Sequence, residues 1–309
     1  MSRAPLVVAV VGATATGKTD LAGALAARLD AEIVCADSRQ VFRELEIGTG
    51  KPAPGQRAQR PHHLFDALGL GDRASAGWYA RAARAACAAI HARGRLPVLV
   101  GGSGLYLAAA RRGLADEPPH DPALRERLKV EAASCGPEAL HHRLALSDPE
   151  AAARLKPRDT QRITRALEVL EASGRPLSWW LARPRGPAVA GEWRVFELTA
   201  APDALAGRIA RRTRWMFDSG LVEETRALLA AGHEVALAAL RAVGYDEAME
   251  LNAGRMTRRE AEERTSLRTR QLAKRQRTWF RHQVEAVRLP ADTADVEGWT
   301  RAVLAGLRA

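Results

Sequence analysis

The sequence has few aromatic residues, few cysteines and only a short apolar run near its start. Aromatic residues make up 5% of the 309 residues, and the apolar run before Gly12 is the six-residue segment 6–11, LVVAVV. Six residues are too few for a membrane-spanning helix or the core of a signal peptide. The three cysteines, Cys35, Cys87 and Cys135, are far apart and odd in number, which is untypical of a disulfide framework or a zinc site. We therefore expect a cytoplasmic protein.

Acidic residues are absent from residues 264–281, a stretch that holds seven basic side chains. The whole chain has a formal net charge of +11. An excess of this size suits a polyanionic partner, either nucleic acid or an anionic membrane surface. Hydrophobic residues make up 47% of the chain, which argues against a disordered protein. The length allows one large domain or two smaller ones with a real core.

A phosphate-binding motif lies between an expected strand and an expected helix, in residues 7–20, VVAVVGATATGKTD. In G-x-x-x-x-G-K-[ST], backbone N–H groups and the helix N-terminus hold phosphate. Lys18 would reach the phosphate oxygens, and Thr19 could place its hydroxyl on magnesium. The alternative is a strand–turn–helix corner that matches by chance. The predicted phosphate-binding residues are Gly12, Ala13, Thr14, Ala15, Thr16, Gly17, Lys18 and Thr19.

The rest of the chain predicts an α/β fold: a P-loop core with a parallel sheet, and a mostly helical insertion domain. β-branched runs predict strands, and spaced leucines predict helices. The expected strands are 6–11, 31–37, 96–102, 193–200 and 284–289, and the expected early helices are 19–29 and 77–94. Between about 119 and 190 the pattern changes to short helices, several of which start with aspartate. The expected domains are 1–118 (core, first part), 119–191 (helical insertion) and 192–309 (core, second part, with basic C-terminal helices).

An aspartate is missing where a nucleotide-hydrolysing enzyme or a kinase with this loop usually has one, at the end of an apolar strand. The natural strand is 96–102, LPVLVGG, and it ends in glycines. The nearest alternative is Asp37, at the end of the second strand. The motif therefore supports phosphate binding but not nucleotide hydrolysis. By position alone, Asp37 is explained as well by a cap or Asx turn as by a catalytic role.

Six spaced motifs carry a family resemblance. They are GATATGKT (12–19), DSRQVFRELEIGTGKP (37–52), VGGSGLYL (100–107), DTQRITRALEVLEASGRPLS (159–178), RAVGYDEAME (241–250) and TRQLAKRQRTWFR (269–281). Together they resemble the tRNA dimethylallyltransferases (isopentenyl-diphosphate:tRNA transferases, the MiaA family) from about residue 7 to 282. The resemblance implies transfer of a dimethylallyl group from dimethylallyl diphosphate to N6 of the adenosine 3′-adjacent to the anticodon. The tRNAs are those reading codons that begin with U, diphosphate leaves intact, and Mg²⁺ assists.

The resemblance also implies catalytic residues. Asp37 would be the general base, or the group that hydrogen-bonds and orients the N6 amine. Ser103 stands where the family usually has threonine and would hydrogen-bond near the target nucleotide or the diphosphate. Arg212 aligns with an arginine that binds the diphosphate, although Arg211 and Arg214 are close by. The target base is expected to flip out and meet Asp37 from one side of a channel, with the donor entering from the other side.

Further residues would contact tRNA, with the insertion (119–191) among the contacting parts. Basic side chains would mostly bind phosphate, which gives affinity but little sequence choice. Gln40 has a donor and an acceptor that suit an adenine edge. Trp279 and Phe280 could stack on a splayed base, although such aromatics more often pack into a core. The implied contacts are Asp37, Ser38, Arg39, Gln40, Ser103, Arg125, Gln161, Arg162, Ile163, Thr164, Arg165, Arg241, Ala242, Val243, Gly244, Tyr245, Asp246, Lys274, Arg275, Gln276, Arg277, Thr278, Trp279, Phe280 and Arg281.

Besides Ser103, two further positions depart from the family pattern, and two other functions remain open. Arg39 stands where methionine is usual, and Phe42 stands where tyrosine is usual. A small-molecule or nucleoside kinase would share the phosphate loop and would consume ATP. A non-catalytic RNA-binding protein on a decayed loop would bind tRNA without chemistry. The expected oligomeric state is a monomer.

Overall fold

The computed structural model describes residues 4–115, 117–118, 120–293 and 295–308. The chain divides into two compact units, Met1–Arg111 with Ala188–Ala309, and Arg112–Pro187. We call the first the core unit and the second the helical unit. The helical unit overlaps the insertion expected at 119–191. The expected boundary at residue 119 lies outside the described residues.

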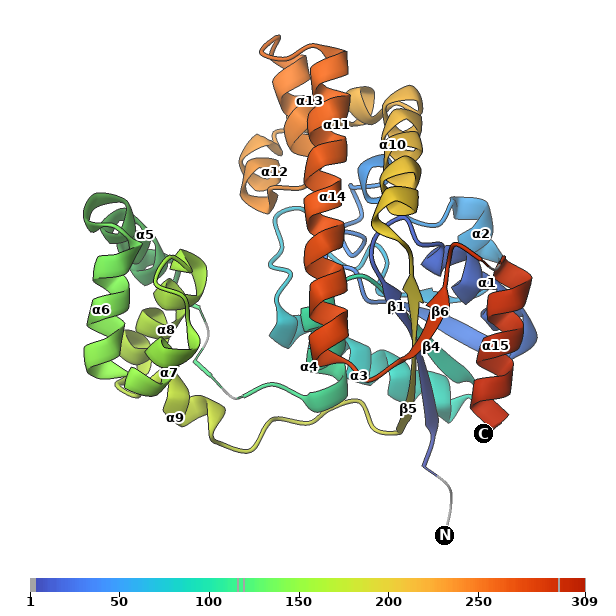
Figure 1. The fold of residues 1–309 in the computed structure, drawn as a ribbon, viewed down its shortest axis with the longest axis horizontal. Helices are drawn as coiled ribbons and strands as arrows, with labels where there is room; N and C mark the ends of the chain where they lie inside the picture. Colours follow the sequence, from blue (N-terminus) through green and yellow to red (C-terminus); the bar gives the residue numbers. More distant parts are fainter. Residues whose placement is uncertain (1–3, 116, 119, 294, 309) are drawn as a thin grey trace. The chain divides into compact units, whose positions relative to one another are not determined.

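The core unit is built on a six-stranded parallel sheet with the strand order β3-β2-β4-β1-β5-β6 (Figure 1). The strands are β1 Leu6–Gly12, β2 Ala31–Cys35, β3 His62–His63, β4 Leu96–Gly101, β5 Glu192–Thr199 and β6 Val287–Pro290. All five expected strands are present, with ends that differ by up to three residues. The two-residue strand β3 was not predicted, because two histidines carry no strand pattern.

Strand β1 lies at the centre of the sheet and explains why the first apolar run is continuous. It pairs with β4 on one side, where Val8 lies opposite Val98, and with β5 on the other, where Val10 lies opposite Phe196. Residues 7–12 of β1 are buried. Parallel strands covered on both faces favour unbroken hydrophobic runs over alternation.

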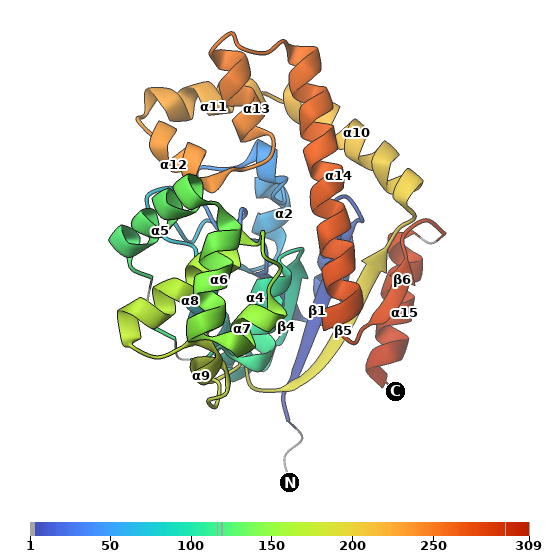
Figure 2. The ribbon, with the colours of Figure 1, turned by 60° about the vertical axis from the view of Figure 1, so that its left-hand side comes forward.

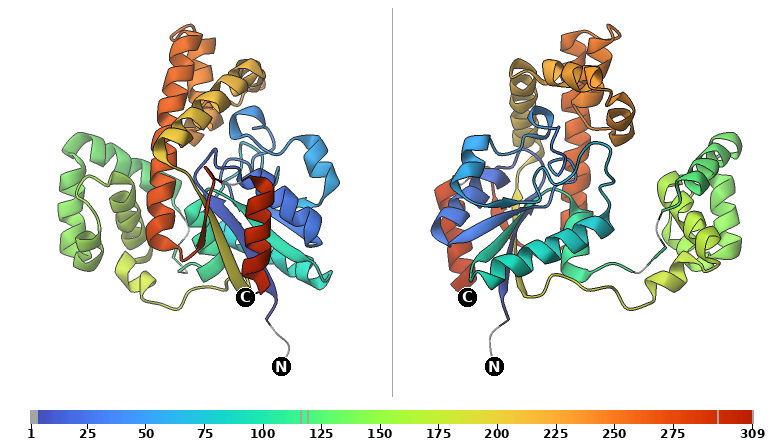
Figure 3. Two further views of the ribbon diagram at one scale, coloured as in Figure 1. Left: turned by 45° about the vertical axis from the view of Figure 1, so that its right-hand side comes forward. Right: turned by 180° about the vertical axis from the view of Figure 1, so that it is seen from behind.

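Helices cover both faces of this sheet. The helices of the core unit are α1 Lys18–Arg28, α2 Pro54–Gln59, α3 Ala76–Ala92, α4 Gly104–Arg112, α10 Pro202–Asp218, α11 Leu221–Ala230, α12 Glu234–Leu240, α13 Tyr245–Asn252, α14 Arg258–Gln283 and α15 Val296–Arg308, with the 3₁₀ helix η1 Ile47–Thr49. Of these, α11, α12 and α13 pack mainly on one another and on α10 and α14 instead of on the sheet. Helices α1 and α15 pack together on one face, and α3 packs on β2 and β4 from the other (Figure 3). The long helix α14 packs against α10 and contacts β1 (Figure 2).

The helical unit contains α5 Pro122–Cys135, α6 Pro137–Ser147, α7 Pro149–Arg154, α8 Thr160–Ser173 and α9 Leu177–Leu181, and its described residues contain no strand. Three of these helices begin as the sequence predicts, because the side chains of Asp121, Asp148 and Asp159 accept hydrogen bonds from the first-turn N–H groups. The unit has a core of its own, formed by residues such as Leu144 and Ile163.

None of the described helices combines the length and apolar character that crossing a membrane requires. Cys35 and Cys87 are buried, Cys135 is exposed, and all three thiols are free. The cytoplasmic location stays a prediction.

Candidate active site

Three loops meet at one edge of the sheet because β2, β4 and β1 are neighbouring parallel strands. The phosphate loop, as we call residues 12–19, follows β1, residues 36–40 follow β2, and residues 102–103 follow β4. Ligands of open α/β sheets bind beyond the carboxyl ends of the strands. The edge at the carboxyl ends of β1, β2 and β4 is therefore the expected position of a ligand-binding site.

The phosphate loop turns tightly into α1. Gly17 caps the helix with a φ of 96°, in the left-handed region that glycine adopts without strain. The Lys18 ammonium donates a hydrogen bond to the carbonyl oxygen of Ala13 at 2.6 Å, and the Thr16 hydroxyl donates to the same oxygen at 2.8 Å. The lysine thus folds back over the loop that it follows, which is where a bound phosphate would lie.

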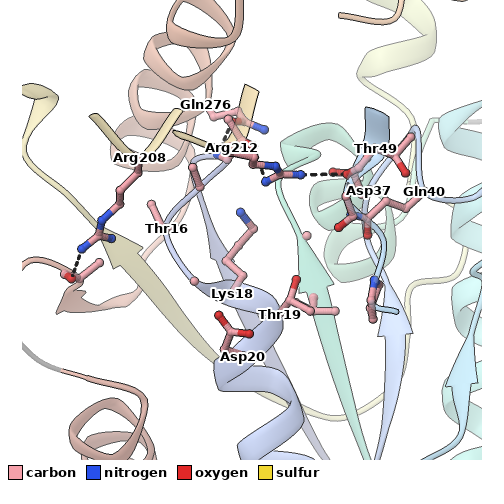
Figure 4. Close-up of a pocket in the computed structure, with 18 of the residues that line it drawn as sticks. Thr16, Lys18, Thr19, Asp20, Asp37, Gln40, Thr49, Arg208, Arg212 and Gln276 are labelled. Atoms are coloured by element: carbon pink, nitrogen blue, oxygen red, sulfur yellow. Dashed lines mark hydrogen bonds between the residues drawn. The ribbon is translucent and has the colours of Figure 1, made fainter. Parts of the chain in front are cut away.

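A cavity of about 530 Å³ opens over this loop (Figure 4). Thr19 and the basic residues Lys18, Arg208, Arg211 and Arg212 border it. Burial lowers the pKa of Lys18 to about 8; the Asp37 carboxylate opposes this shift, and Arg212 adds to it. Clustered cations with few carboxylates make the cavity suitable for a polyanionic ligand.

Arg212 joins two loops of the site from helix α10. Its guanidinium donates to the Thr14 hydroxyl at 3.3 Å and to the Thr49 carbonyl oxygen at 3.1 Å. A Cβ at Gly50 would lie 2.0 Å from a guanidinium nitrogen, so the close approach of Arg212 requires glycine there. The sequence prediction had left Arg211 and Arg214 as alternatives. Arg211 borders the same cavity but is exposed, and Arg214 is also exposed.

Asp37 lies two residues beyond the end of β2 and borders two cavities. One is the phosphate-loop cavity, and the other is a larger cavity of about 710 Å³. An Asp37 carboxylate oxygen accepts a hydrogen bond from the Arg39 backbone N–H at 2.8 Å, which is an Asx turn. Asp37 can form this turn and still face both cavities, because one carboxylate has several acceptor sites.

Ser103 fixes the backbone beside Asp37. Its hydroxyl oxygen accepts a hydrogen bond from the Ser38 N–H at 2.9 Å, and its own N–H donates to the Ala36 carbonyl oxygen at 3.2 Å. The hydroxyl proton is still free to donate to a ligand in the larger cavity, which Ser103 borders. A Cβ at Gly101 would lie 2.1 Å from the Ala36 carbonyl oxygen. This close backbone contact explains why β4 ends in glycine and carries no aspartate.

Gln276 connects the phosphate loop to the loop after β4 (Figure 4). Its side-chain oxygen accepts a hydrogen bond from the Thr14 N–H at 2.9 Å, and its side-chain nitrogen donates to the Gly102 carbonyl oxygen at 3.0 Å. Gln276 was predicted to contact tRNA. In this structure its amide is engaged within the protein, and it borders both cavities.

The loop that follows η1 depends on a buried lysine that the sequence prediction missed. The Lys51 side chain is fully buried, and its ammonium donates to the Phe42 carbonyl oxygen at 2.6 Å and pairs with Asp66 at 2.5 Å. Phe42 is itself 1% exposed, so the hydroxyl that tyrosine would add there would lie in the core. Nothing in the sequence distinguishes a buried lysine from a surface one.

Other predicted RNA contacts have partners within the protein. The Gln40 side chain donates to the Thr49 and Gly50 carbonyl oxygens at 3.1 and 3.2 Å, and it borders the phosphate-loop cavity. Arg39 donates to the Leu240 carbonyl oxygen at 2.5 Å, at the end of α12, and it borders the larger cavity.

Several of the predicted RNA contacts are buried. Phe280 is 1% exposed and belongs to the core, so its ring packs in the interior instead of stacking on a base. Trp279 is partly buried against the same core. Tyr245 hydrogen-bonds Glu224 and accepts from the Gly48 N–H, which holds the loop at η1. The buried members of the predicted set are Ile163, Thr164, Ala242, Gly244, Tyr245 and Phe280. Ala242 and Tyr245 nevertheless border the larger cavity, and contact of this set with tRNA stays a prediction.

The residues at the basic C-terminal end of α14 border two different cavities. Arg275 and Gln276 border the larger cavity, as do Arg241, Ala242 and Val243. By contrast, a separate groove of about 630 Å³ between α10 and α14 is bordered by Lys274, Arg277, Thr278 and Arg281. The structure therefore does not bring all of residues 274–281 to one site. In the helical unit, Gln161 and Arg162 are exposed, Arg125 is partly exposed, and Arg165 pairs with Glu117 and Glu168 at 3.1 and 3.3 Å.

Helix α15 brings one more residue to the site that the sequence prediction did not identify. The Trp299 ring borders the phosphate-loop cavity and would lie 3.0 Å from a Cβ at Gly17. Its indole N–H donates to the Pro290 carbonyl oxygen at 3.0 Å. The buried positions Trp299, Thr300 and Val303 follow a helical spacing, which was a usable signal.

Comparisons with known proteins give a consistent result. A family model described as IPP transferase matches residues 40–283, and one described as isopentenyl transferase matches residues 5–61. A tRNA dimethylallyltransferase of Halorhodospira halophila is 46% identical over 307 residues, covering 97% of this chain and 99% of the relative. One of Myxococcus xanthus is 46% identical over 286 residues and covers 92% of each. The structure of the full-length tRNA isopentenylpyrophosphate transferase of Bacillus halodurans matches with a TM-score of 0.69 at 33% identity, covering 98% of this chain and 97% of that chain.

Proposed function

The chain belongs to the IPP transferase family, and we propose that it is a tRNA dimethylallyltransferase. It transfers a dimethylallyl group from dimethylallyl diphosphate to N6 of the adenosine 3′-adjacent to the anticodon, in tRNAs reading codons that begin with U, and releases diphosphate. The observation that carries this proposal is that a cation-lined phosphate cavity and a larger cavity meet at one carboxylate, Asp37. The proposed enzyme acts as a cytoplasmic monomer.

The smaller cavity is assigned to the donor. The N-terminus of α1 and the loop N–H groups favour a diphosphate, and Lys18 and Arg212 supply positive charge beside it. Negative charge builds on the bridging oxygen as the carbon–oxygen bond of the donor breaks. Fixed cations at that point stabilise the transition state more than the ground state.

A magnesium ion fits this arrangement through Thr19. Its hydroxyl borders the same cavity as Lys18, while the described residues contain no cluster of three or more His, Cys, Asp or Glu side chains that could hold a metal. Mg²⁺ in phosphate sites commonly takes one or two protein oxygens and completes its shell with phosphate and water. When bound there, the ion would neutralise charge on the diphosphate.

The larger cavity is assigned to the flipped adenine. N6 attacks the first carbon of the dimethylallyl group, the bond from that carbon to the diphosphate oxygen breaks, and one N6 proton passes to the Asp37 carboxylate. An exocyclic adenine amine is a weak nucleophile, so a carboxylate on its proton helps the attack. Ser103 keeps the Asp37 loop in place and has a hydroxyl proton to donate.

Contacts to the remainder of the tRNA are assigned to exposed polar residues. They would bind phosphate, fix the orientation of the RNA and make binding depend on salt. We retain in this role Arg125, Gln161, Arg162, Arg241, Lys274, Arg275, Arg277, Thr278 and Arg281, which are exposed or partly exposed. Ser38, Arg39, Val243, Gly244 and Asp246 stay predicted contacts with no phosphate-binding role.

A kinase is not favoured by the same geometry. Nucleotide-hydrolysing and kinase sites of this loop class hold magnesium with an aspartate at the end of a neighbouring strand. Here that strand end is Gly101, where any Cβ would collide with the Ala36 backbone at 2.1 Å.

The proposal is tested with purified protein, Mg²⁺, unmodified anticodon stem-loop RNA and dimethylallyl diphosphate, without ATP. Nuclease digestion and mass spectrometry should show one added prenyl group on the adenosine after the anticodon. No product in this mixture, together with ATP hydrolysis when ATP is supplied, would reopen the kinase interpretation.

Replacing Gln276 with alanine is expected to lower kcat/KM for dimethylallyl diphosphate by about 10- to 30-fold, because two hydrogen bonds worth about 1 kcal/mol each are lost. Gln276→Glu should be similarly impaired, since a carboxylate can accept from Thr14 but cannot donate to Gly102. Steady-state kinetics with each substrate in turn measure the effect, with the exposed Gln59→Ala as control. A variant that loses only RNA affinity would show that Gln276 is an RNA contact instead.

The pH dependence should report on Lys18. Its pKa of about 8 lies below the usual value, so the ammonium of the free enzyme loses its proton as the pH rises through 8. The charged form holds the diphosphate, and therefore kcat/KM for dimethylallyl diphosphate should fall above about pH 8. Thermal unfolding at each pH serves as the control for loss of fold. A profile that stays flat to pH 10 would contradict the role of Lys18 as a titrating diphosphate ligand.

A further inference from the structure

The helical unit carries an exposed tryptophan with the guanidinium groups of two arginines over its ring. Trp179, in α9, is 36% exposed. The guanidinium carbon of Arg183 lies 4.4 Å from the centre of the Trp179 ring, and that of Arg175 lies 5.3 Å from it. Both arginines are exposed. Large aromatic side chains are usually buried in a core, so an exposed one flanked by cations calls for an explanation.

The segment that carries Trp179 is fixed to the helical unit. The neighbouring Trp180 donates its indole N–H to the Ser173 hydroxyl at 3.1 Å, and its ring meets Trp179 edge-on with centres 4.9 Å apart. The Ser178 N–H donates to a carboxylate oxygen of Asp148, which is 1% exposed, at 2.9 Å. The exposed ring is thus held in place before any partner binds, which lowers the entropy cost of binding.

The charges around Trp179 differ from those of the rest of the unit. Most arginines of the helical unit form ion pairs with carboxylates: Arg127, Arg143, Arg154, Arg158, Arg162 and Arg165. Across the described part of the chain, no carboxylate forms an ion pair with Arg175, Arg183 or Arg185. Residues 172–187 hold these three basic side chains and no acidic one. Uncompensated positive charge is therefore concentrated where the aromatic ring is exposed.

We propose that Trp179, with Arg175 and Arg183, is an RNA-binding surface that takes an unpaired nucleotide of the tRNA substrate. Aromatic rings and guanidinium planes stack on unpaired bases, and arginines next to them bind the adjoining phosphates. The inference rests on the proposed function, because that function supplies the RNA. It adds residues that the family motifs did not assign. A protein partner would suit the apolar ring, but three unpaired arginines favour a polyanion.

Replacing Trp179 with alanine is expected to weaken binding of unmodified anticodon stem-loop RNA about 10-fold, measured by fluorescence anisotropy, because stacking of one base is lost. Trp179→Phe should retain most of the affinity. Arg175→Ala and Arg183→Ala should each weaken binding a few-fold and reduce the slope of log Kd against log salt by about 1. Matched controls in the same unit are Leu146→Ala, which removes an exposed apolar side chain, and Arg158→Ala, which removes an exposed arginine paired with Glu138.

Two outcomes would contradict the proposal that this surface binds RNA. One is a Trp179→Ala variant that binds the RNA within two-fold of the wild type. The other is a variant that binds RNA normally but changes self-association in size-exclusion chromatography, which would make the surface a protein contact. If the Trp179→Ala variant unfolds, the proposal is tested by ultraviolet crosslinking of the wild type to 4-thiouridine-labelled stem-loop RNA. The adduct is expected on the peptide that contains Trp179, and its absence there would contradict the proposal. Failure of the proposed function is distinct, because the wild type would then yield no prenylated RNA.

Discussion

Replacing Asp37 with alanine is expected to lower turnover by about 10²- to 10⁴-fold while tRNA affinity stays within a few-fold. The carboxylate is the group that both cavities share and that can take the N6 proton. It contributes little to RNA binding, which depends mainly on phosphate contacts elsewhere. Single-turnover rates with saturating substrates measure the loss in the chemical step, and anisotropy measures the affinity.

A second variant, Asp37→Asn, separates the proton-accepting role of Asp37 from its role in the turn. Asparagine keeps an oxygen that accepts the Arg39 N–H, so the Asx turn is preserved, but it cannot take up a proton. We expect the asparagine variant to be nearly as slow as the alanine variant. Near-normal turnover of Asp37→Asn would mean that the aspartate only shapes the turn, which is the alternative that the sequence alone left open.

Replacing Lys18 with alanine is expected to lower kcat/KM for dimethylallyl diphosphate by about 10²- to 10³-fold, with RNA affinity unchanged within a few-fold. The ammonium group lies over the phosphate loop and borders the cavity assigned to the donor, while Lys18 does not line the larger cavity. Its loss should weaken both diphosphate binding and stabilisation of the leaving group. Initial rates at varied donor concentration give the value.

The control for Lys18 is Lys129→Ala in the helical unit, where the lysine is exposed and pairs with Glu126 at 2.8 Å. That variant should use the donor as the wild type does. If Lys18→Ala instead lost RNA affinity and kept its donor kinetics, the assignment of the two cavities would have to be exchanged.

The sheet was predictable because its signals are local. The apolar runs that form β1 and β4 end in glycines, and a run of this kind in a parallel sheet needs no knowledge of distant residues. The turn from β1 into α1 was predictable for the same reason. Strand β3 was missed because it is two residues long, and α15 was not proposed although Trp299 and Val303 share one face.

The parts of the site that escaped prediction depend on contacts between distant segments. Gln276 bonds Thr14 across 262 residues and Gly102 across 174, whereas the family motif that contains it implied an RNA contact. The burial of Lys51 follows from its bond to Asp66, and the burial of Phe280 follows from the packing of α14. A family motif marks which residues matter, but it does not separate those that touch a ligand from those that hold the loops in place.

The central claim is that the phosphate loop holds a diphosphate that leaves intact. Its most direct test is to measure the diphosphate and the orthophosphate released for each prenyl group transferred, in a reaction with stem-loop RNA, dimethylallyl diphosphate and Mg²⁺ and without ATP. We expect one intact diphosphate for each prenyl group found on the RNA, and no orthophosphate. Release of orthophosphate in step with prenylation, or a requirement for ATP, would contradict the account.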